Sequence, residues 1–422
     1  MLRTFIASLT LPGSDLFWGF IGPYAVGMLV ALFGVPLMRA IAVRRRLYDR
    51  PDSGLKPHER PIPYLGGVGI WLGWLAVVVL HMTVEQAGRG PLAWVLLGGT
   101  VLMLVGLLDD LRNLSPKLRL VVQAVVALLL VYGGPGRGAW SALVQPVAAE
   151  LPGWLAGEWV GWCFDAVFCI LLLIGASNST NLIDGLDGLC GGVVGIACLA
   201  FWTLTLLLWH VGGGQEMDPG LRLRIVLCAA VVGAGSAFLA FNFHPATIFM
   251  GDSGSLLLGF NVAVLIALVT RQGGWRGLVG GLLVFGLPIL DTSLAVARRW
   301  LNGRPLFVGD RSHLYDQLRD RGFSVPKTVY ICYLLGVVFG ALGCACAVLP
   351  RSAVVAVAIA APIVAAVVCR RSGLLRVDDA AQRSHQSSQG ENAETLPARR
   401  DRNAEIDKSK SQKVKKSDGG GS

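Results

Sequence analysis

The sequence predicts an all-α integral membrane protein, a polytopic bundle of about eleven transmembrane helices with its active-site loops on the cytoplasmic face. Three observations support this fold class: the composition, a series of long apolar segments, and an uneven distribution of Lys and Arg. The 422 residues are 54% hydrophobic and 15% charged, with a mean hydropathy of +0.59. A soluble protein carries about 25% charged residues, so a soluble globular domain is disfavoured.

Eleven segments are long and apolar enough to be spanning helices, which need about 20 residues each. For the shorter ones, a buried helix or a re-entrant segment is the alternative. The segments are 17–43, 64–82, 92–108, 118–133, 162–177, 189–209, 223–241, 255–270, 275–297, 328–349 and 353–369. We expect residues 1–369 to form one transmembrane domain. Residues 370–422 are polar, with few aromatic or β-branched residues, and we expect a disordered cytoplasmic tail there.

The Lys and Arg distribution predicts the orientation. Alternating spans place loops 44–63, 109–117, 178–188, 242–254 and 298–327 on one side, together with the C-terminal tail. Loops 44–63 and 298–327 are rich in Lys and Arg, whereas loops on the other side carry scattered single arginines. Because cytoplasmic loops carry the excess of positive charge, the N-terminus is expected outside and the C-terminus inside. The polar motifs all fall in the cytoplasmic set.

The most informative motif is NSTNLIDGLDG at residues 178–188. It carries Asn178, Asn181, Asp184 and Asp187 at intervals of three, which would share one face of a helix, and no cation. Gly185 and Gly188 permit a close backbone approach to a ligand. Uncompensated carboxylates at a membrane edge are costly, so a cation or a polar substrate is expected here rather than a plain polar turn.

The loop DDLRNLSPK at 109–117 adds a second group of ionisable side chains. Asp109 and Asp110 are adjacent at an expected helix end, and Lys117 closes the loop. The two acids can bind Mg²⁺, which takes a few carboxylates together with substrate phosphate oxygens. One of them can instead act as a base on a hydroxyl or phosphate. A solvated acid pair, or a cap on the helix that begins near Pro116, is the structural alternative.

Loop 242–254, NFHPATIFMGDSG, contains one carboxylate, Asp252, in a Gly-rich turn after Asn242 and Phe249. Such an Asp can form the turn by a local hydrogen bond, or it can present its carboxylate to a metal while backbone amides face phosphate. Phe249 can stack on a base or can simply pack against an apolar span. A metal ligand at Asp252 is the functional hypothesis.

Two basic loops complete the cytoplasmic set. GDRSHLYDQLRDRG, in loop 298–327, places Arg311 and His313 where they can hold a diphosphate, Arg by bidentate contacts; an amphipathic surface helix is the alternative. In loop 44–63, Arg60 can hold phosphate, together with Lys56 and His58, although a plain positively charged loop explains the charge as well. Asp291 is an acid inside a span and therefore a further site candidate, unless it pairs with Arg298 or Arg299.

Four ordered motifs, LLDD, NSTNLIDGLDG, FNFHPATIFMGDSGSLLLG and DRSHLYDQL, resemble those of the polyprenyl-phosphate N-acetylhexosamine-1-phosphate transferases. The resemblance covers residues 40–325. It implies transfer of a sugar-1-phosphate from a UDP-sugar to polyprenyl phosphate with release of UMP, a Mg²⁺ cofactor (with Mn²⁺ as an alternative), and a place in the bacterial inner membrane. The implied process is the first membrane step of the synthesis of a cell-surface glycan such as O-antigen, teichoic acid or exopolysaccharide.

The HERPIPYLGG stretch is similar to the WecA/TagO branch, whose usual substrate is UDP-GlcNAc. Tyr315 and Asp316 stand where further His residues are common, which disfavours the phospho-MurNAc-pentapeptide transferase branch and also departs from the WecA/TagO pattern. No nucleic acid is expected as a partner, and a homodimer is left open.

The resemblance also implies roles for individual residues. Asp252 resembles the Mg²⁺ ligand, Asp109 the base or phosphate-orienting acid, and Asp110 its partner. Asn242 and Phe249 resemble uracil contacts, and the lining of the nucleotide pocket corresponds to Asp184, Gly185, Leu186 and Asp187. Asn178 and Asn181, in the same motif, are candidate substrate-binding residues. His313 and Arg311 resemble diphosphate binders, and Lys117 and Arg60 match basic positions near the phosphates.

Two other classes remain as alternatives. A transporter or flippase would use its intramembrane acids for proton coupling, and it predicts broken helices and internal repeats with polar groups near the bilayer centre. No convincing repeat is present, and the strongest acids lie at span ends. A CDP-alcohol phosphotransferase requires a DGxxAR motif that the sequence lacks.

Overall fold

The structure is a computed structural model, and it describes residues 15–49, 61–84, 89–147, 152–153, 155, 157–214, 219–301 and 313–371. These residues belong to one compact unit. The predicted 370–422 tail lies outside the described residues, except for its first two positions at the end of the last helix.

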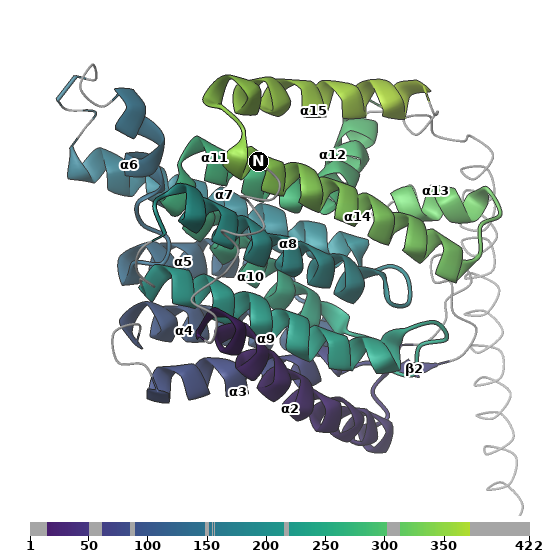
Figure 1. Ribbon diagram of the computed structural model, residues 1–422. Helices are drawn as coiled ribbons and strands as arrows, with labels where there is room; N and C mark the ends of the chain where they lie inside the picture. The colour runs from purple at the N-terminus through teal and green to yellow at the C-terminus, as the bar shows by residue number, and fades with distance from the viewer. Residues whose placement is uncertain are drawn as a thin grey trace, which may run out of the picture. The chain divides into compact units, whose positions relative to one another are not determined.

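The described chain is helical almost throughout, as predicted (Figure 1). A two-stranded antiparallel pair, β1 and β2, accompanies the helices. The elements are α2 (Asp15–Arg45), β1 (Tyr48–Asp49), β2 (Ile62–Pro63), α3 (Gly66–Val84), α4 (Arg89–Arg112), α5 (Pro116–Gly133), α6 (Ala139–Val144), η1 (Gln145–Val147), α7 (Glu158–Ile183), α8 (Leu189–Val211), α9 (Pro219–Asn242), α10 (Gly251–Gly273), α11 (Trp275–Val284), α12 (Gly286–Leu301), α13 (Leu314–Asp320), α14 (Val325–Val348) and α15 (Arg351–Arg371).

Among the described residues, nine helices are long and apolar enough to cross a membrane, and α11 with α12 makes a tenth candidate bent by 73°. The eleven predicted segments therefore correspond to helices, with one difference in the segment 275–297. That segment breaks at Phe285 because Gly286 and Pro288 follow, and Pro lacks the N–H that a continuous helix needs. The last predicted segment, 353–369, lies in α15, whose apolar part is shorter.

Helix α10 is the centre of the bundle, and the most hydrophobic stretch of it is completely buried. It packs against α4, α7, α3 and α11. Its one buried amide in mid-helix, Asn261, accepts a hydrogen bond from the Trp74 indole at 2.9 Å. This interior polar group is therefore paired, and apolar side chains on the outer helices, such as Leu29, Val30 and Phe33 on α2, are left exposed for lipid.

The helix ends separate into two groups along the bundle. In Figure 1, α6 lies at one end, and β2 and α13 lie at the other. Helix α7 connects the two ends, since Asp165 near its start binds the backbone beside α6 and Asn181 near its end binds α10. Sixteen residues of helix separate them, which is about 24 Å at 1.5 Å per residue. The predicted motifs gather at the Asn181 end.

Candidate functional site

The centre of the candidate site is a set of side chains from four helices joined by hydrogen bonds. Asp252, in the first turn of α10, accepts a hydrogen bond from Asn181 of α7 at 2.6 Å and one from Arg119 of α5 at 2.9 Å. The same Arg119 nitrogen donates to Asp109 of α4 at 2.5 Å. Three of the four predicted motif loops therefore meet at one point, although they lie up to 143 residues apart in the sequence.

The adjacent acids Asp109 and Asp110 have different partners. Asp110 accepts the backbone N–H groups of Asp252 at 2.8 Å and Ser253 at 3.2 Å, so it caps the α10 N-terminus, where a negative charge is favourable. Asp109 is buried and accepts the N–H of Leu114 at 2.6 Å as well as the Arg119 guanidinium. Asp110 therefore sets the position of Asp252, and Asp109 sets the position of Arg119.

Glycines allow α4 and the start of α10 to come this close. A Cβ on Gly106 would lie 2.4 Å from the Asp252 carbonyl oxygen, and one on Gly251 would lie 2.5 Å from the Asp110 carboxylate. Gly251 also has a φ of +71°, a backbone conformation that L residues other than Gly seldom adopt. The GDSG sequence is therefore needed for the approach of the two helices.

The NSTNLIDGLDG stretch is not a single helical face, which differs from the prediction. Helix α7 ends at Ile183, and Gly188 has a φ of +79° at the start of α8. Asn178 and Asn181 lie on the last turns of α7, whereas Asp184 and Asp187 lie in the turn that follows. The two glycines break the helix, so the acids are directed by the turn and not by helical periodicity.

Asp184 faces the acids of the cluster. Burial of its carboxyl among protein atoms, followed by the nearby charges of Asp252 and Asp110, raises the pKa of Asp184 well above its usual range. Asp187 adds a smaller repulsion. In the part of the chain that the structure describes, no hydrogen bond to the Asp184 side chain is found. The carboxyl groups at this end of the bundle therefore repel one another when ionised, and a bound cation would relieve that repulsion.

Asp187 and Asn242 hold two loops together. Asp187 accepts hydrogen bonds from the Ala246 N–H at 3.0 Å and from His244 at 2.8 Å. The Asn242 oxygen accepts the Gly188 N–H at 2.9 Å, and its amide donates to the Ile248 carbonyl at 3.0 Å. The hydrogen-bonding groups of Asn242 are thus largely occupied by backbone, so its predicted uracil contact stays a prediction beside an evident structural role.

His313 reaches this end of the bundle from α13. Its Nδ1 is 2.7 Å from Asp291 of α12, and its ring stacks on Tyr315 with the centroids 5.5 Å apart. The Tyr315 hydroxyl donates to the Leu182 carbonyl at 3.3 Å, and the ring leaves no room for a Cβ on Gly185. His313 is therefore connected to the 181–188 turn through Tyr315, and Asp291 has a partner other than the arginines proposed from the sequence.

The remaining predicted residues are less central. Asn178 donates to Ile174 and Gln123, one turn deeper in the bundle than Asn181. Lys117 is exposed in the first turn of α5, and Leu186 is buried in the core. Phe249 is half-buried, and its backbone pairs with Pro63 and Gly66, which joins loop 242–254 to the start of α3. Arg60 and Arg311 lie outside the described residues, as do Lys56 and His58.

Arg119 is the site residue that sequence reasoning missed. The sequence interpretation assigns it to the apolar segment 118–133 and gives it no chemical role. Its signal was available, since it is the sole charged residue between positions 118 and 133. A lone cation in a spanning segment is expected to face a partner or a functional site, and here it contacts two acids.

The donor set fits a divalent cation of the magnesium type. Within the described residues, no three acidic, His or Cys side chains are close enough together to hold a metal on their own. Mg²⁺ does not need such a cage, because it keeps waters and takes one or two carboxylates plus substrate phosphate oxygens. The Asp252 side chain is 29% exposed and can be reached from outside. Among the described residues, the neighbouring acids outnumber the arginine that pairs with them.

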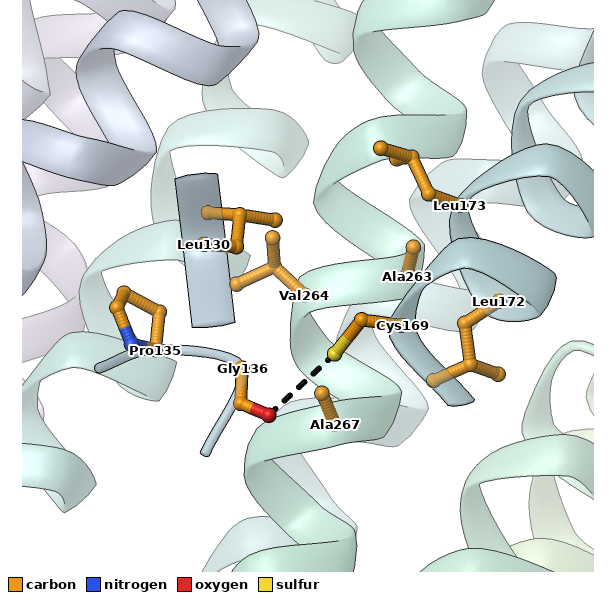
Figure 2. Close-up of a pocket in the computed structure, with 9 residues that line it drawn as sticks. All are labelled: Leu130, Pro135, Gly136, Cys169, Leu172, Leu173, Ala263, Val264 and Ala267. Carbon is orange, nitrogen blue, oxygen red and sulfur yellow. Dashed lines mark hydrogen bonds between the residues drawn. The ribbon is translucent and has the colours of Figure 1, made fainter. Parts of the chain in front are cut away.

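A small cavity elsewhere in the bundle does not belong to this site. Figure 2 shows it between α5, α7 and α10, where the Cys169 thiol contacts the Gly136 carbonyl oxygen at 3.4 Å. Its lining is Leu130, Pro135, Gly136, Cys169, Leu172, Leu173, Ala263, Val264 and Ala267. The lining is apolar and the space is far too small for a nucleotide, so the cavity is a packing defect.

Comparison with known proteins identifies the family. Residues 92–270 match glycosyl transferase family 4. The chain is 32% identical to the probable undecaprenyl-phosphate N-acetylglucosaminyl 1-phosphate transferase of Bacillus subtilis (strain 168), over 75% of this chain and 82% of that protein. It is 34% identical to the decaprenyl-phosphate N-acetylglucosaminephosphotransferase of Mycobacterium tuberculosis (strain ATCC 25618 / H37Rv), over 70% and 77% of the two chains.

A third relative carries a different name. The phospho-N-acetylmuramoyl-pentapeptide-transferase of Geobacillus thermodenitrificans (strain NG80-2) is 32% identical over 76% of this chain and 95% of that protein. The chain is a multi-pass membrane protein and belongs to glycosyl transferase family 4. The resemblance drawn from the four motifs, to polyprenyl-phosphate sugar-phosphate transferases, is thereby confirmed.

Proposed function

We propose that this protein transfers N-acetylhexosamine-1-phosphate, with GlcNAc as the sugar, from a UDP-sugar to polyprenyl phosphate and releases UMP. The observation that carries the proposal is the cluster of Asp109, Asp110, Asp252 and Asn181 around Arg119 at one end of an apolar bundle. A polyprenyl phosphate has its chain in the bilayer and its phosphate at the membrane surface, which is the level at which these helices end.

In this reaction, an oxygen of the lipid phosphate forms a bond to the β-phosphorus of the UDP-sugar. The bond between that phosphorus and the oxygen bridging to the α-phosphate breaks, and the electron pair leaves with UMP. A phosphate monoester with a second pKa near 6 is largely deprotonated at pH 7, so the main task of the protein is to bring two anions together. Such transfers depend on positioning and charge neutralisation.

The described residues can meet this requirement. Arg119 supplies a fixed positive charge between Asp109 and Asp252, and Asp109 keeps it in place. We infer that the primary role of Asp109 is to orient Arg119 and the lipid phosphate, with proton abstraction as the alternative role. Asp184 and Asp187 would form the wall of the nucleotide pocket, with Gly185, Leu186, Asn242 and Phe249 around it.

Asp252 would hold the Mg²⁺ ion, and Mn²⁺ is the alternative. When bound, the ion would neutralise the charge that develops on the phosphate oxygens. Asn181 orients the Asp252 carboxylate, and Asp110 holds the backbone that carries it. His313 and Arg311 would contact the diphosphate, and Lys117 and Arg60 would add positive charge at the rim.

We infer that the site faces the cytoplasm of a bacterium, at its inner membrane. The support is the excess of Lys and Arg in the motif-bearing loops, since cytoplasmic loops carry such an excess. The C-terminus would then be cytoplasmic and the N-terminus outside. The product would begin the synthesis of a cell-surface glycan. Assembly as a homodimer stays a prediction.

The sugar is the least constrained part of the proposal. Relatives of similar identity are named for N-acetylglucosamine-phosphate and for phospho-N-acetylmuramoyl-pentapeptide transfer. The sequence favours the first because the HERPIPYLGG stretch resembles the WecA/TagO branch, whereas the absence of further histidines beside His313 departs from both groups. A panel of UDP-sugars with one lipid acceptor distinguishes the two, and UDP-GlcNAc is the expected substrate.

The direct test uses the purified full chain, undecaprenyl phosphate and UDP-GlcNAc labelled in the sugar. The expected result is a labelled lipid that depends on Mg²⁺ and on the lipid phosphate, with one UMP formed per lipid. Exchange of label between UMP and the UDP-sugar, dependent on lipid phosphate, separates an enzyme from a transporter. Failure to label lipid with any UDP-N-acetylhexosamine or with UDP-MurNAc-pentapeptide would contradict the proposal.

A further inference from the structure

Asp291 is an acid buried inside α12, with a side chain 3% exposed. One carboxylate oxygen is 2.7 Å from Nδ1 of His313, and the other accepts the Leu314 N–H at 2.6 Å. Both contacts reach across more than twenty residues to α13. A buried carboxylate is costly unless both oxygens have hydrogen-bond partners, and here the two partners are the His ring and the first backbone N–H of α13.

The chemistry of this pair specifies the state of the ring. An ionised carboxylate can only accept hydrogen bonds, so the proton between the two groups resides on Nδ1. Nε2 is then the ring nitrogen left for a ligand. The hydrogen bond made by one ring nitrogen of a histidine determines which nitrogen remains available to a ligand. Asp291 binds Nδ1 and therefore leaves Nε2 of His313 for the ligand.

A second contact holds the ring in place. Tyr315 stacks on it with an angle of 7° between the ring planes, and the Tyr315 hydroxyl bonds to Leu182. The imidazole is therefore clamped between a carboxylate on α12 and a ring that rests on the 181–188 turn. That turn carries Asp184 and follows Asn181, which donates a hydrogen bond to Asp252. His313 is thus fixed relative to the acid cluster.

We propose that Asp291 is a positioning residue for the transfer reaction. It holds His313 with a proton on Nδ1, so that Nε2, once it carries the second proton of the imidazolium, donates a hydrogen bond to the diphosphate of the sugar nucleotide. This inference rests on the proposed function, because Asp291 acts through His313, and the proposed function has His313 bind the diphosphate. A carboxylate that only capped α13 would need the Leu314 N–H alone, whereas Asp291 divides its two oxygens between the backbone and the imidazole.

The test is a double-mutant cycle on kcat/KM with Asp291→Asn, His313→Ala and the double variant, using UDP-GlcNAc and undecaprenyl phosphate. Asp291→Asn is expected to lower kcat/KM about 10- to 100-fold, the effect of one hydrogen bond to a charged group. In the His313→Ala background, Asp291→Asn should have almost no effect on kcat/KM, because the imidazole that Asp291 orients is absent. Equal losses in both backgrounds would overturn the proposal, and Asp291→Glu should restore part of the activity.

Asp165→Asn is the matched control. Asp165 is also a buried acid in a helix, 4% exposed, and it accepts two backbone N–H groups beside α6. This variant should show independent, additive behaviour with His313→Ala. A coupling as large as that of Asp291 would show that the cycle reports general destabilisation.

A measurement without turnover separates this inference from the proposed function. The ¹⁵N spectrum of the six labelled histidines, with His313 assigned from His313→Gln, should show the proton on Nδ1 of His313 in the wild-type protein. A proton on Nε2 alone would overturn the inference, whichever substrate the enzyme takes. If the wild type failed to transfer any sugar-phosphate but kept the Nδ1 proton, the proposed function would fall and the Asp291–His313 pairing would stand.

Discussion

The two ends of α7 hold acids in opposite ways. Near its start, Asp165 accepts the N–H groups of Gly138 and Trp140 at 2.8 and 2.9 Å. Beyond its other end, Asp184 faces Asp252 and Asp110, and its pKa is raised. Asp165 is satisfied by backbone, whereas in the described part of the chain Asp109 and Asp252 share Arg119 and no hydrogen bond to the Asp184 side chain is found. Buried acids occur at both ends of α7. Only at the Asp184 end do carboxyl groups face one another, and this is the end where we expect a ligand.

The largest effect is expected at Asp252. Asp252→Asn should lower kcat at least about 10³-fold, since loss of one preorganised charge at such a site costs that much. It should also abolish the rise in melting temperature that Mg²⁺ gives the wild-type protein. The measurements are lipid labelling and a thermal shift with and without Mg²⁺. Wild-type activity of the variant at limiting Mg²⁺ would remove Asp252 from the metal site.

Arg119 should come next. Arg119→Ala removes the cation between Asp109 and Asp252, and we expect kcat to fall roughly 10²-fold, because two acids then repel the incoming phosphates. Arg119→Lys should recover little, since one ammonium does not reproduce the guanidinium fork. Lys117→Ala, two residues earlier and exposed at the rim, is the comparison and should lower kcat less than Arg119→Ala, because solvent screens an exposed charge. Equal losses for Arg119→Ala and Lys117→Ala would mean that only the general positive charge of the rim matters.

Gly185 gives a steric prediction at the same end. Gly185→Ala places a Cβ 2.1 Å from the Tyr315 hydroxyl oxygen, so Tyr315 and α13 must shift. We expect a loss of about 1–3 kcal/mol in the free energy of unfolding, and Tyr315→Ala in the same chain should recover part of it. Gly175→Ala is the control, because its Cβ meets nothing within 4 Å. A tolerated Gly185→Ala would show that α13 does not rest on this turn.

The smallest effect on activity is expected at the other end. Asp165→Asn leaves one backbone N–H without an acceptor, so the free energy of unfolding should fall by about 1–3 kcal/mol. Transfer activity, measured below the melting temperature, should stay within about twofold of wild type, since about 24 Å of helix separates Asp165 from Asn181. A large loss of kcat in a folded Asp165→Asn protein would contradict the conclusion that the Asp165 end of α7 is structural and that the Asn181 end carries the reaction.

Much of the fold could be predicted because its causes are local. Apolar length predicts spanning helices, and the segments so identified match helices in the described chain. The one break, between α11 and α12, also has a local cause in Gly286 and Pro288, which the hydropathy of a continuous apolar segment conceals. Helix ends at Pro116 and Gly134 follow from equally local signals.

The site was predicted in its residue types and only partly in its geometry. The structure brings Asp109, Asp110, Asn181 and Asp252 together, because polar groups at the same ends of adjacent helices can meet. The difference between Asp109 and Asp110 could not be predicted. It depends on which carboxylate reaches the N-terminus of α10 and which reaches α5, and that depends on how the helices pack. Arg119 was missed because an apolar segment was read for its length and not for its single charge.

The sequence by itself determined the class of protein, since hydropathy, Lys and Arg distribution and four ordered motifs are readable without coordinates. It also determined the family, as the comparisons bear out. Only the tertiary structure decided the partners: Arg119 between two acids, Asp110 on the backbone of α10, and Asp291 on the His313 ring. Hydrogen bonds and ion pairs between distant segments depend on distances of a few ångströms, which the packing of helices sets and the order of residues along the chain does not.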